Sequence, residues 1–249
     1  MMKSRFKNFE WFLTWCFRAH DSASAFLGKH LFAVKRSMLI LAHLSLFGFF
    51  FPEARKEFGA LSADILIGIL FLSPLSKIFR MRLLMQLMGI RRELGILMAY
   101  LATVHGLGYL LDPEWFSVFI GPYVWTDFFA IEPRLILGLG AYLLTLPLLL
   151  TSNTLALRFL GGKHWKQLHR LVYGAFVLAI FHRFFTRSES WLDVWGLIQA
   201  GALIGAYVFV RALAWKNFIP AFRECNAYIG ARYAEYTLRQ KTDDTKITL

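Results

Sequence analysis

The chain has very little cysteine and few charged residues. Its 249 residues include only Cys16 and Cys225, which excludes a secreted domain stapled by several disulfides. The same count excludes a structural zinc site, an iron–sulfur cluster and the C-x-x-C-H motif for covalent haem attachment. Charged residues make up 18% of the chain, against about 25% in an ordinary soluble domain. Intrinsic disorder is excluded too, because 57% of the residues are hydrophobic.

The abundant residues are apolar, and they fall in six runs. Each run is long enough, or nearly so, to cross about 30 Å of hydrocarbon as a helix. The runs are expected to be helical because hydrocarbon offers exposed peptide groups no hydrogen-bond partner. The sequence therefore predicts an all-α fold, a polytopic membrane helix bundle with six transmembrane helices. These helices are expected at residues 37–51, 61–79, 94–111, 135–150, 168–185 and 194–213.

Basic residues set the direction of the predicted bundle. Of the 28 Lys and Arg residues, 23 lie in four stretches that alternate with loops poor in basic residues. By the positive-inside rule these four stretches face the cytoplasm, so both termini are predicted to be cytoplasmic. The net charge is +12, but the bases are spread between apolar runs, which predicts a lipid bilayer and no nucleic acid as partner. The four stretches are residues 1–36, 77–92, 158–170 and 211–249.

The predicted domain organisation follows from these spans. Residues 1–36 form a cytoplasmic N-terminal segment, in which Trp11 and Trp15 indicate an interfacial helix. Residues 37–215 form the six-helix transmembrane domain, and residues 216–249 form a cytoplasmic C-terminal tail.

Four of the seven histidines lie in the predicted spans or at their rims, namely His43, His105, His169 and His182. An ionisable residue inside a membrane is costly and usually faces an interior site. For a lone histidine such as His43, the simpler interpretation is a hydrogen bond between helices.

His105 and His182 are predicted to lie at similar heights on the third and fifth spans. At 1.5 Å per residue, His105 is about 9 Å and His182 about 5 Å from the outer end of its span. Two neutral imidazoles that face each other across a bundle form an axial pair for haem iron. These two histidines are therefore the first candidate metal ligands.

The neighbouring residues allow two interpretations. Arg183 follows His182 and could meet a haem propionate, or it could be an ordinary interfacial charge. Gly106, Gly108 and Gly174 could leave room for a flat macrocycle, or they could serve helix packing.

His169 is the candidate for a second haem. It precedes His182 by 13 residues, about 19 Å along a helix, which places it at the cytoplasmic rim. The facing positions of the third span hold Arg91 and Arg92, so the inner pair is incomplete unless His43 or His164 substitutes. His169 and His182 would also lie about 140° apart around one ideal helix. One haem and two haems both stay open.

Three blocks of sequence carry a family resemblance. The first runs from residues 91–95 (RRELG) through Tyr100 and His105 to Tyr109. The second comprises residues 150–152 (LTS), Leu160, Gly161, residues 165–173 (WKQLHRLVY) and His182, and the third is residues 72–75 (LSPL). With these blocks, residues 37–215 resemble the ferric-reductase-like transmembrane family, and within it the MsrQ (YedZ) branch of haem-binding membrane subunits.

The resemblance implies a six-helix bundle that holds haem b through His105, His169 and His182. In that family electrons pass from a cytosolic flavin reductase, directly or through a bound flavin such as FMN, to a periplasmic molybdenum-containing reductase. The chain would then be the electron-transfer subunit of a methionine-sulfoxide reductase system in the bacterial inner membrane. The alternatives are a free-standing ferric reductase and a small transporter whose intramembrane histidines bind protons or substrate.

A nucleotide-binding fold is not expected in this chain. No G-x-G-x-x-G motif opens a strand-to-helix unit, so the reductant must come from elsewhere, and an electron-transfer subunit is expected rather than a self-contained enzyme. The basic inner residues could receive a flavin phosphate or an acidic protein, or they could be only the positive-inside signal. They are Arg80, Arg82, Arg91, Arg92, Lys163, Lys166 and Arg170.

Overall fold

The structure is a computed structural model that describes residues 2–79, 81–114, 133–186 and 194–216, together with 224, 227–228 and 230–238. Within these residues the regular elements are helices, so the all-α class is confirmed. Arg80, most of the stretch 112–134 between the third and fourth predicted spans, and much of the predicted C-terminal tail lie outside the described residues.

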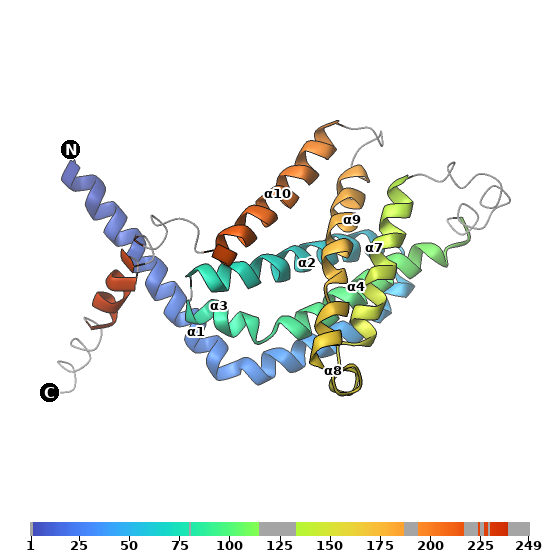
Figure 1. Ribbon diagram of the computed structural model, residues 1–249, viewed down its shortest axis with the longest axis horizontal. Coiled ribbons are helices and arrows are strands. Elements are labelled where there is room, and N and C mark those ends of the chain that lie inside the picture. The colour runs from blue at the N-terminus through green and yellow to red at the C-terminus, as the bar shows by residue number, and fades with distance from the viewer. Residues whose placement is uncertain are drawn as a thin grey trace. The chain divides into compact units, whose positions relative to one another are not determined.

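The helices follow one another along the chain as Figure 1 labels them. Each of the six predicted spans falls on one or two of these helices. They are α1 (Met2–Ser45), the 3-10 helix η1 (Leu46–Phe50), α2 (Ala54–Phe79), α3 (Arg82–Met88), α4 (Arg91–Leu110), α7 (Pro133–Leu150), α8 (Thr154–Leu168), α9 (Leu171–Phe185) and α10 (Val194–Lys216).

The chain is a multi-pass membrane protein. Among the described residues four helical segments are long and apolar enough to cross a membrane, namely Thr14–Phe50, Ala54–Phe79, Arg91–Leu110 and Val194–Trp215. α7 and α8 qualify only as a pair, with a bend of 106° between them, which gives a fifth span if the pair is counted as one. α9 is a shorter apolar helix of 15 residues, about 22 Å long. The count of six spans and the cytoplasmic termini stay predictions.

The described residues group into two compact units. The larger unit comprises Lys35–Phe71 and Ile90–Phe209. The smaller unit comprises Met1–Val34, Leu72–Gly89 and Val210–Leu249.

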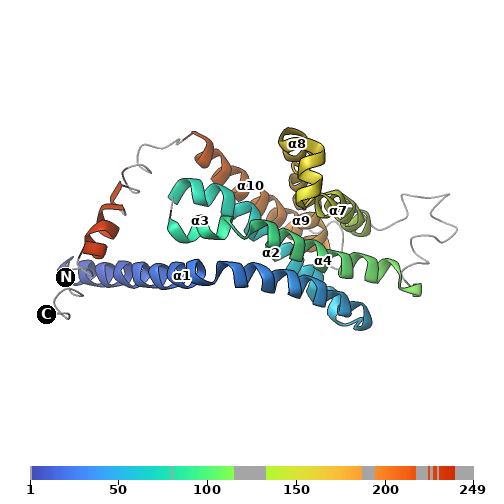
Figure 2. The same ribbon diagram turned by 90° about the horizontal axis from the view of Figure 1, so that it is seen from below.

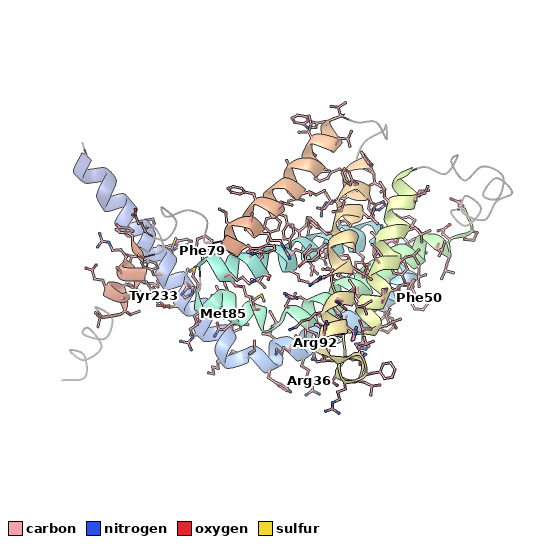
Figure 3. All side chains as sticks on the ribbon, viewed as in Figure 1. Arg36, Phe50, Phe79, Met85, Arg92 and Tyr233 are labelled. Carbon is pink, nitrogen blue, oxygen red and sulfur yellow. The ribbon has the colours of Figure 1, made fainter. Side chains whose placement is uncertain are left out.

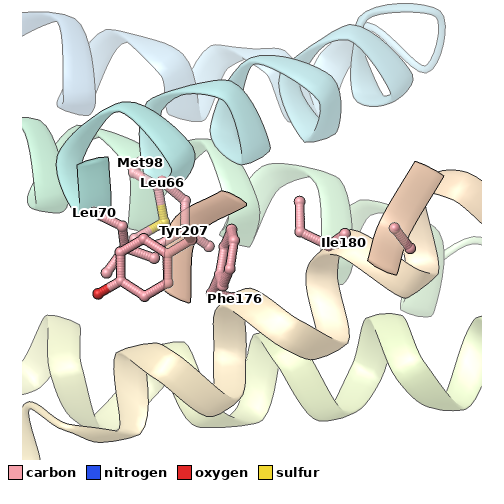
Figure 4. Packing of buried hydrophobic residues seen from close by; sticks show 7 residues of the cluster. Leu66, Leu70, Met98, Phe176, Ile180 and Tyr207 are labelled. Atoms are coloured by element: carbon pink, nitrogen blue, oxygen red, sulfur yellow. The ribbon is translucent and has the colours of Figure 1, made fainter. Parts of the chain in front are cut away.

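Within the larger unit, α7 runs alongside α9 and also packs against α4 (Figures 1 and 2). A buried hydroxyl ties α2 to α4, since Oγ of Ser62 donates to the carbonyl oxygen of Met98 at 3.0 Å. Close-packed apolar side chains from four helices form the core of this unit (Figure 4). They are Leu66 and Leu70 of α2, Met98 of α4, Phe176 and Ile180 of α9, and Ala200 and Tyr207 of α10.

The smaller unit joins the first part of α1 to α3 and to the helical residues 230–238. Oγ of Ser24 on α1 donates to Oε1 of Gln86 on α3 at 3.0 Å. The hydroxyl of Tyr233 donates to the carboxylate of Asp21 on α1. Burial and this hydrogen bond raise the pKa of the Tyr233 hydroxyl to about 12. Residues of the predicted N-terminal segment and C-terminal tail are therefore in contact.

The predicted boundary between an N-terminal segment and the first span falls inside one helix. α1 has 44 residues, and its single non-helical residue is His30, with φ −111° and ψ 15°. The exposed Trp15 lies upstream of that residue on the same helix. The division at residues 36 and 37 stays a prediction.

Phe176→Ala is expected to destabilise the larger unit, because it removes a ring that is 1% exposed and packs against Tyr207. Phe-to-Ala changes in soluble cores cost about 3–5 kcal/mol, and the packing part of that cost applies in a membrane as well. Thermal unfolding in detergent should show a clear drop in the unfolding temperature. Phe209→Ala is the matched control, since Phe209 on α10 is 61% exposed. Equal drops in both variants would contradict this core.

Candidate functional site

The rings of His105 and His182 lie together inside the larger unit. His105 belongs to α4 and His182 to α9, and the two ring centroids are 6.0 Å apart. The ring planes make an angle of 64°, and both side chains are half-buried. The structure therefore brings these two predicted site residues together. Their ligation of iron stays a prediction.

One hydrogen bond determines which nitrogen His105 can offer to a ligand. Nδ1 of His105 lies 2.9 Å from the backbone carbonyl oxygen of Arg55, which can only accept. A neutral His105 therefore carries its proton on Nδ1 and keeps the lone pair on Nε2. Metal-binding histidines usually have such a partner, because it fixes the tautomer and the orientation of the ring.

The side chain of Arg55 holds the C-terminal end of α4. Its Nη1 donates to Oδ2 of Asp112 at 2.9 Å. Gly108 leaves room for this side chain, since an added Cβ there would lie 2.9 Å from Cδ of Arg55. Within the part of the chain that the structure describes, the buried Nε of Arg55 has no hydrogen-bond partner. Arg55 thus links α2 to α4 through both its backbone and its side chain.

Two glycines on facing helices make space for the histidine rings. A Cβ added to Gly59 of α2 would lie 2.5 Å from Nδ1 of His105. A Cβ added to Gly138 of α7 would lie 2.7 Å from Cε1 of His182. Both distances are far below an ordinary carbon contact of about 3.5–4.0 Å. Each ring therefore occupies space that any larger residue at the facing position would fill.

The glycines singled out in the sequence face side chains. A Cβ on Gly106 would lie 3.2 Å from the ring of Tyr142, and a Cβ on Gly174 would lie 3.1 Å from Leu144. Gly108 faces Arg55. These contacts favour helix packing over space for a macrocycle at the three positions.

Arg183 connects the end of α9 to α2. Its Nη1 donates to Oδ1 of Asp64 and, at 3.3 Å, to the carbonyl oxygen of Ala60. The guanidinium next to His182 is therefore held by two acceptors of α2. A contact between Arg183 and a haem propionate stays a prediction.

His169 lies apart from the helix that carries His182. It is the C-terminal cap of α8, and α9 begins at Leu171. The hydroxyl of Thr151 donates to the carbonyl of Pro147 at 2.6 Å, so its oxygen can accept from Nε2 of His169 at 3.2 Å. Trp165 stacks on the His169 ring with centroids 3.8 Å apart.

The other histidines have local partners. Nδ1 of His43 donates to the carbonyl of Leu39 at 2.7 Å, and its Nε2 lies 3.5 Å from the hydroxyl of Tyr100. Nδ1 of the exposed His164 donates to the carbonyl of Leu160 at 3.2 Å. The contact of His43 with Tyr100 joins α1 to α4, as the hydrogen-bond interpretation of a lone histidine expects.

The first turn of α4 carries charge of both signs, and Figure 3 labels Arg92 there. Nη2 of Arg92 donates to Oε1 of Glu93 at 3.0 Å, while Glu93 itself is 2% exposed. Among the described residues, the second carboxylate oxygen of Glu93 has no hydrogen-bond partner. Arg91 is exposed and acts electrostatically on His169. The site residues Arg91 and Arg92 thus lie at the His169 end of the larger unit.

The predicted basic face is divided between the two units. Arg82 belongs to the smaller unit. Lys163, Lys166 and Arg170 belong to the larger unit, where all three are exposed.

The pair of histidines suits a metal ion bound between two imidazoles. With metal–nitrogen bonds of about 2.0–2.1 Å, ligation by both rings would separate their centroids by roughly 6 Å. No group of three or more His, Cys, Asp or Glu side chains that could hold a metal occurs among the described residues. The spacing, the Nδ1 hydrogen bond of His105 and the two glycines therefore fit bis-histidine ligation of a haem.

Four residues of this site were not predicted from the sequence, namely Arg55, Gly59, Asp64 and Gly138. Nothing in their local sequence marks the two glycines or Arg55, because only the packing of helices brings them to the histidines. Asp64 alone carried a signal, as an acidic residue inside the predicted span 61–79.

Residues 57–180 match the family model described as ferric reductase like transmembrane component. This segment is a ferric-reductase-like transmembrane domain. It contains His105 and His169, and the match ends two residues before His182.

Several curated proteins are similar to this chain over half of its length or more. The MsrQ haem-binding subunit of protein-methionine-sulfoxide reductase from Azospira oryzae is 35% identical over 162 residues, which are 65% of this chain and 63% of the relative. MsrQ from Herminiimonas arsenicoxydans is 30% identical over 149 residues, 59% of this chain and 65% of the relative. The magnetosome protein MamZ of Magnetospirillum gryphiswaldense is 33% identical over 135 residues, 53% of this chain but 20% of MamZ.

The chain covers between 42% and 65% of the length of the MsrQ proteins that it matches. No solved structure matches it. The relationship to MsrQ subunits and to the ferric-reductase-like domain rests on sequence similarity.

Gly59→Ala is expected to displace the His105 ring, and Gly138→Ala the His182 ring, because each new methyl group would overlap its imidazole. Nitrogen-15 NMR of labelled histidines should report the changed environment of the affected ring. Gly68→Ala is the matched control on α2, since an added Cβ there meets nothing within 4 Å. Histidine spectra that respond equally to all three changes would contradict the proposed fit between glycines and rings.

Proposed function

We propose that this chain is a haem b-containing transmembrane electron-transfer subunit. It would pass electrons from a cytosolic flavin reductase or a flavin to a periplasmic acceptor, with a methionine-sulfoxide reductase as the expected acceptor. The observation that carries the proposal is the pair of imidazoles of His105 and His182, 6.0 Å apart between α4 and α9. The names of the MsrQ relatives support haem and the methionine-sulfoxide reductase system.

Haem, when bound, supplies a carrier that accepts and releases one electron at a time. The chain's own residues supply ligation and orientation. The carbonyl of Arg55 keeps the proton of His105 on Nδ1, so that Nε2 can ligate. Gly59 and Gly138 give the two rings their space. Arg183, fixed by Asp64, is the guanidinium nearest in sequence to a ligand and could meet a propionate.

The proposed topology has six spans with both termini in the cytoplasm of a bacterium, in the inner membrane. α9 would be the short span, and α7 would cross before α8 turns away at 106°. The excess of bases in the four stretches assigned to the cytoplasm supports this orientation. His105 and His182 would then lie in the outer half, and electrons would move outward.

His169 is the proposed ligand of a second, inner haem, and the haem count is one or two. The single hydrogen bond between its Nε2 and Thr151 leaves Nδ1 as the nitrogen with a lone pair. Arg91 and Arg92 supply positive charge near this end, which suits a flavin phosphate such as that of FMN. The donor would be a cytosolic flavin reductase, and the acceptor a periplasmic molybdenum-containing reductase.

His105→Ala and His182→Ala are each expected to remove the outer haem, because each leaves one axial position without its ligand. His169→Ala should lower the haem-to-protein ratio while the low-spin spectrum of the outer haem persists, if two haems are bound. With one haem bound, His169→Ala should leave the ratio unchanged. The measurement is the absorption spectrum of the purified protein before and after dithionite, with haem quantified per chain.

His30→Ala is the matched control, since His30 lies in the smaller unit and outside the predicted spans, so haem content should not change. Wild-type protein without haem would overturn the proposed function. Full haem content in both His105→Ala and His182→Ala would overturn the assigned ligands.

Electron entry should depend on Arg91. The purified protein should not be reduced by NADPH alone, whereas reduced FMN or a flavin reductase should reduce it rapidly. Arg91→Gln should slow that step several-fold at about 0.01 M salt, where the screening length is about 30 Å, and less at about 0.15 M, where it is about 8 Å. Stopped-flow absorption measures the rate, and haem content should not change.

Lys56→Gln serves as the control for Arg91→Gln, because Lys56 is exposed in the first turn of α2, at the end of that helix assigned to the outer side. Arg92 is avoided because it pairs with the buried Glu93. Rapid reduction by NADPH alone would contradict the need for a separate flavoprotein.

A further inference from the structure

α8 turns away from α7 and stays on the surface of the larger unit. The two helices enclose an angle of 106°, and α8 has no buried residue. Figures 1 and 2 show α8 at the shared end of α7 and α9. Arg158, Lys163 and Lys166 lie on this helix of 15 residues, so burial in hydrocarbon would be costly. Its direction and charge are those of a helix that lies in the membrane interface.

The two halves of α8 have different surfaces. Gly161 separates them with φ 71° and ψ 153°, a left-handed φ that side-chain-bearing residues rarely adopt. Before it, Leu155 and Phe159 share a helix face and are 77% and 89% exposed. After it, Lys163 and Lys166 are spaced by three residues and are both exposed. Arg170 follows four residues later as the N-cap of α9 and is also exposed.

These exposed side chains lie on a helix whose two ends are fixed by contacts. Oδ1 of Asn153 accepts from the N–H of Ala156 at 2.8 Å and caps the start of α8. At the other end, Nε1 of Trp165 donates to the carbonyl of Thr151 at 2.8 Å, and its ring stacks on His169. The apolar pair and the basic stripe of Lys163, Lys166 and Arg170 are therefore held in fixed places, on α8 and on the N-cap of α9 that follows it.

No acidic residue lies near this element in the sequence. Between Glu132 and Glu189 the chain has no Asp or Glu. The basic stripe therefore needs an anion from outside this stretch, and the apolar pair needs an apolar partner. An anionic phospholipid carries both groups in one molecule.

We propose that α8 is a binding site for an anionic phospholipid. Leu155 and Phe159 contact its acyl chains, and Lys163, Lys166 and Arg170 hold its headgroup phosphate. The assignment of this site to the cytoplasmic leaflet rests on the proposed topology. The site itself does not depend on bound haem. A free flavin phosphate or an acidic protein would engage the bases, but neither would engage Leu155 and Phe159 in the same molecule as an anionic phospholipid does.

Native mass spectrometry of the full chain in detergent tests the site, with phosphatidylglycerol and phosphatidylcholine of identical acyl chains as probes. Wild type should bind phosphatidylglycerol about tenfold or more tightly than phosphatidylcholine, since each base near an anionic headgroup contributes roughly fivefold. The triple variant Lys163→Gln, Lys166→Gln, Arg170→Gln should bring the ratio of the two affinities close to one. Leu155→Ser with Phe159→Ser should weaken the binding of both lipids.

The control variant Arg36→Gln, Lys77→Gln, Arg82→Gln removes the same charge from other stretches assigned to the cytoplasm and should keep the wild-type ratio. A triple variant of α8 that also keeps this ratio would overturn the proposal. Displacement of phosphatidylglycerol by FMN or inorganic phosphate at equal concentration would overturn it too, because the occupant would then be a phosphate compound and not a lipid.

The absorption spectrum of the same samples separates this inference from the proposed function. Lipid selectivity without haem supports the site and overturns the function. Bound haem together with equal binding of the two lipids supports the proposed function and overturns the lipid site.

Discussion

The site depends on the close approach of two imidazole rings carried by different helices. His105 and His182 reach 6.0 Å only because α2 and α7 present glycine where each ring lies. A methyl group at Gly59 or Gly138 would lie 2.5 or 2.7 Å from a ring atom, so either the ring or the helix would have to move. Close packing makes such a shift costly, since neighbouring side chains leave little free volume. The identity of two residues outside α4 and α9 therefore sets the geometry between them.

Polar groups near the ends of α2, α4 and α9 impose the second constraint, because a polar group removed from water is costly without a partner. The structure pairs them between helices. The carbonyl of Arg55 accepts from His105, the guanidinium of Arg55 donates to Asp112, and Arg183 donates to Asp64. Each bond also positions a residue at or beside a histidine of the pair. Satisfying buried polar groups and orienting the site are thus achieved by the same contacts.

Long apolar runs predicted the helices well, because a span needs such a run and leaves a clear signal. They also predicted the proximity of His105 and His182, since height along a helix follows from residue number alone. Rotation about the helix axis and the choice of neighbours do not follow from residue number. For that reason Gly106 and Gly174, next to or near a ligand candidate in sequence, pack against Tyr142 and Leu144, while the glycines that face the rings come from other helices. The ligation of iron by His105 and His182 stays a prediction.

The position of His169 changes the geometry that the sequence suggested for the inner end. On one continuous helix, His169 and His182 would point about 140° apart, which disfavours two sites on a shared face. In the structure His169 caps α8, and α9 starts only at Leu171. Its direction is set by Thr151 and Trp165 and not by the period of α9. The separation of about 140° therefore no longer argues against two haems. Because Trp165 belongs to α8, the orientation of His169 depends on the placement of that helix.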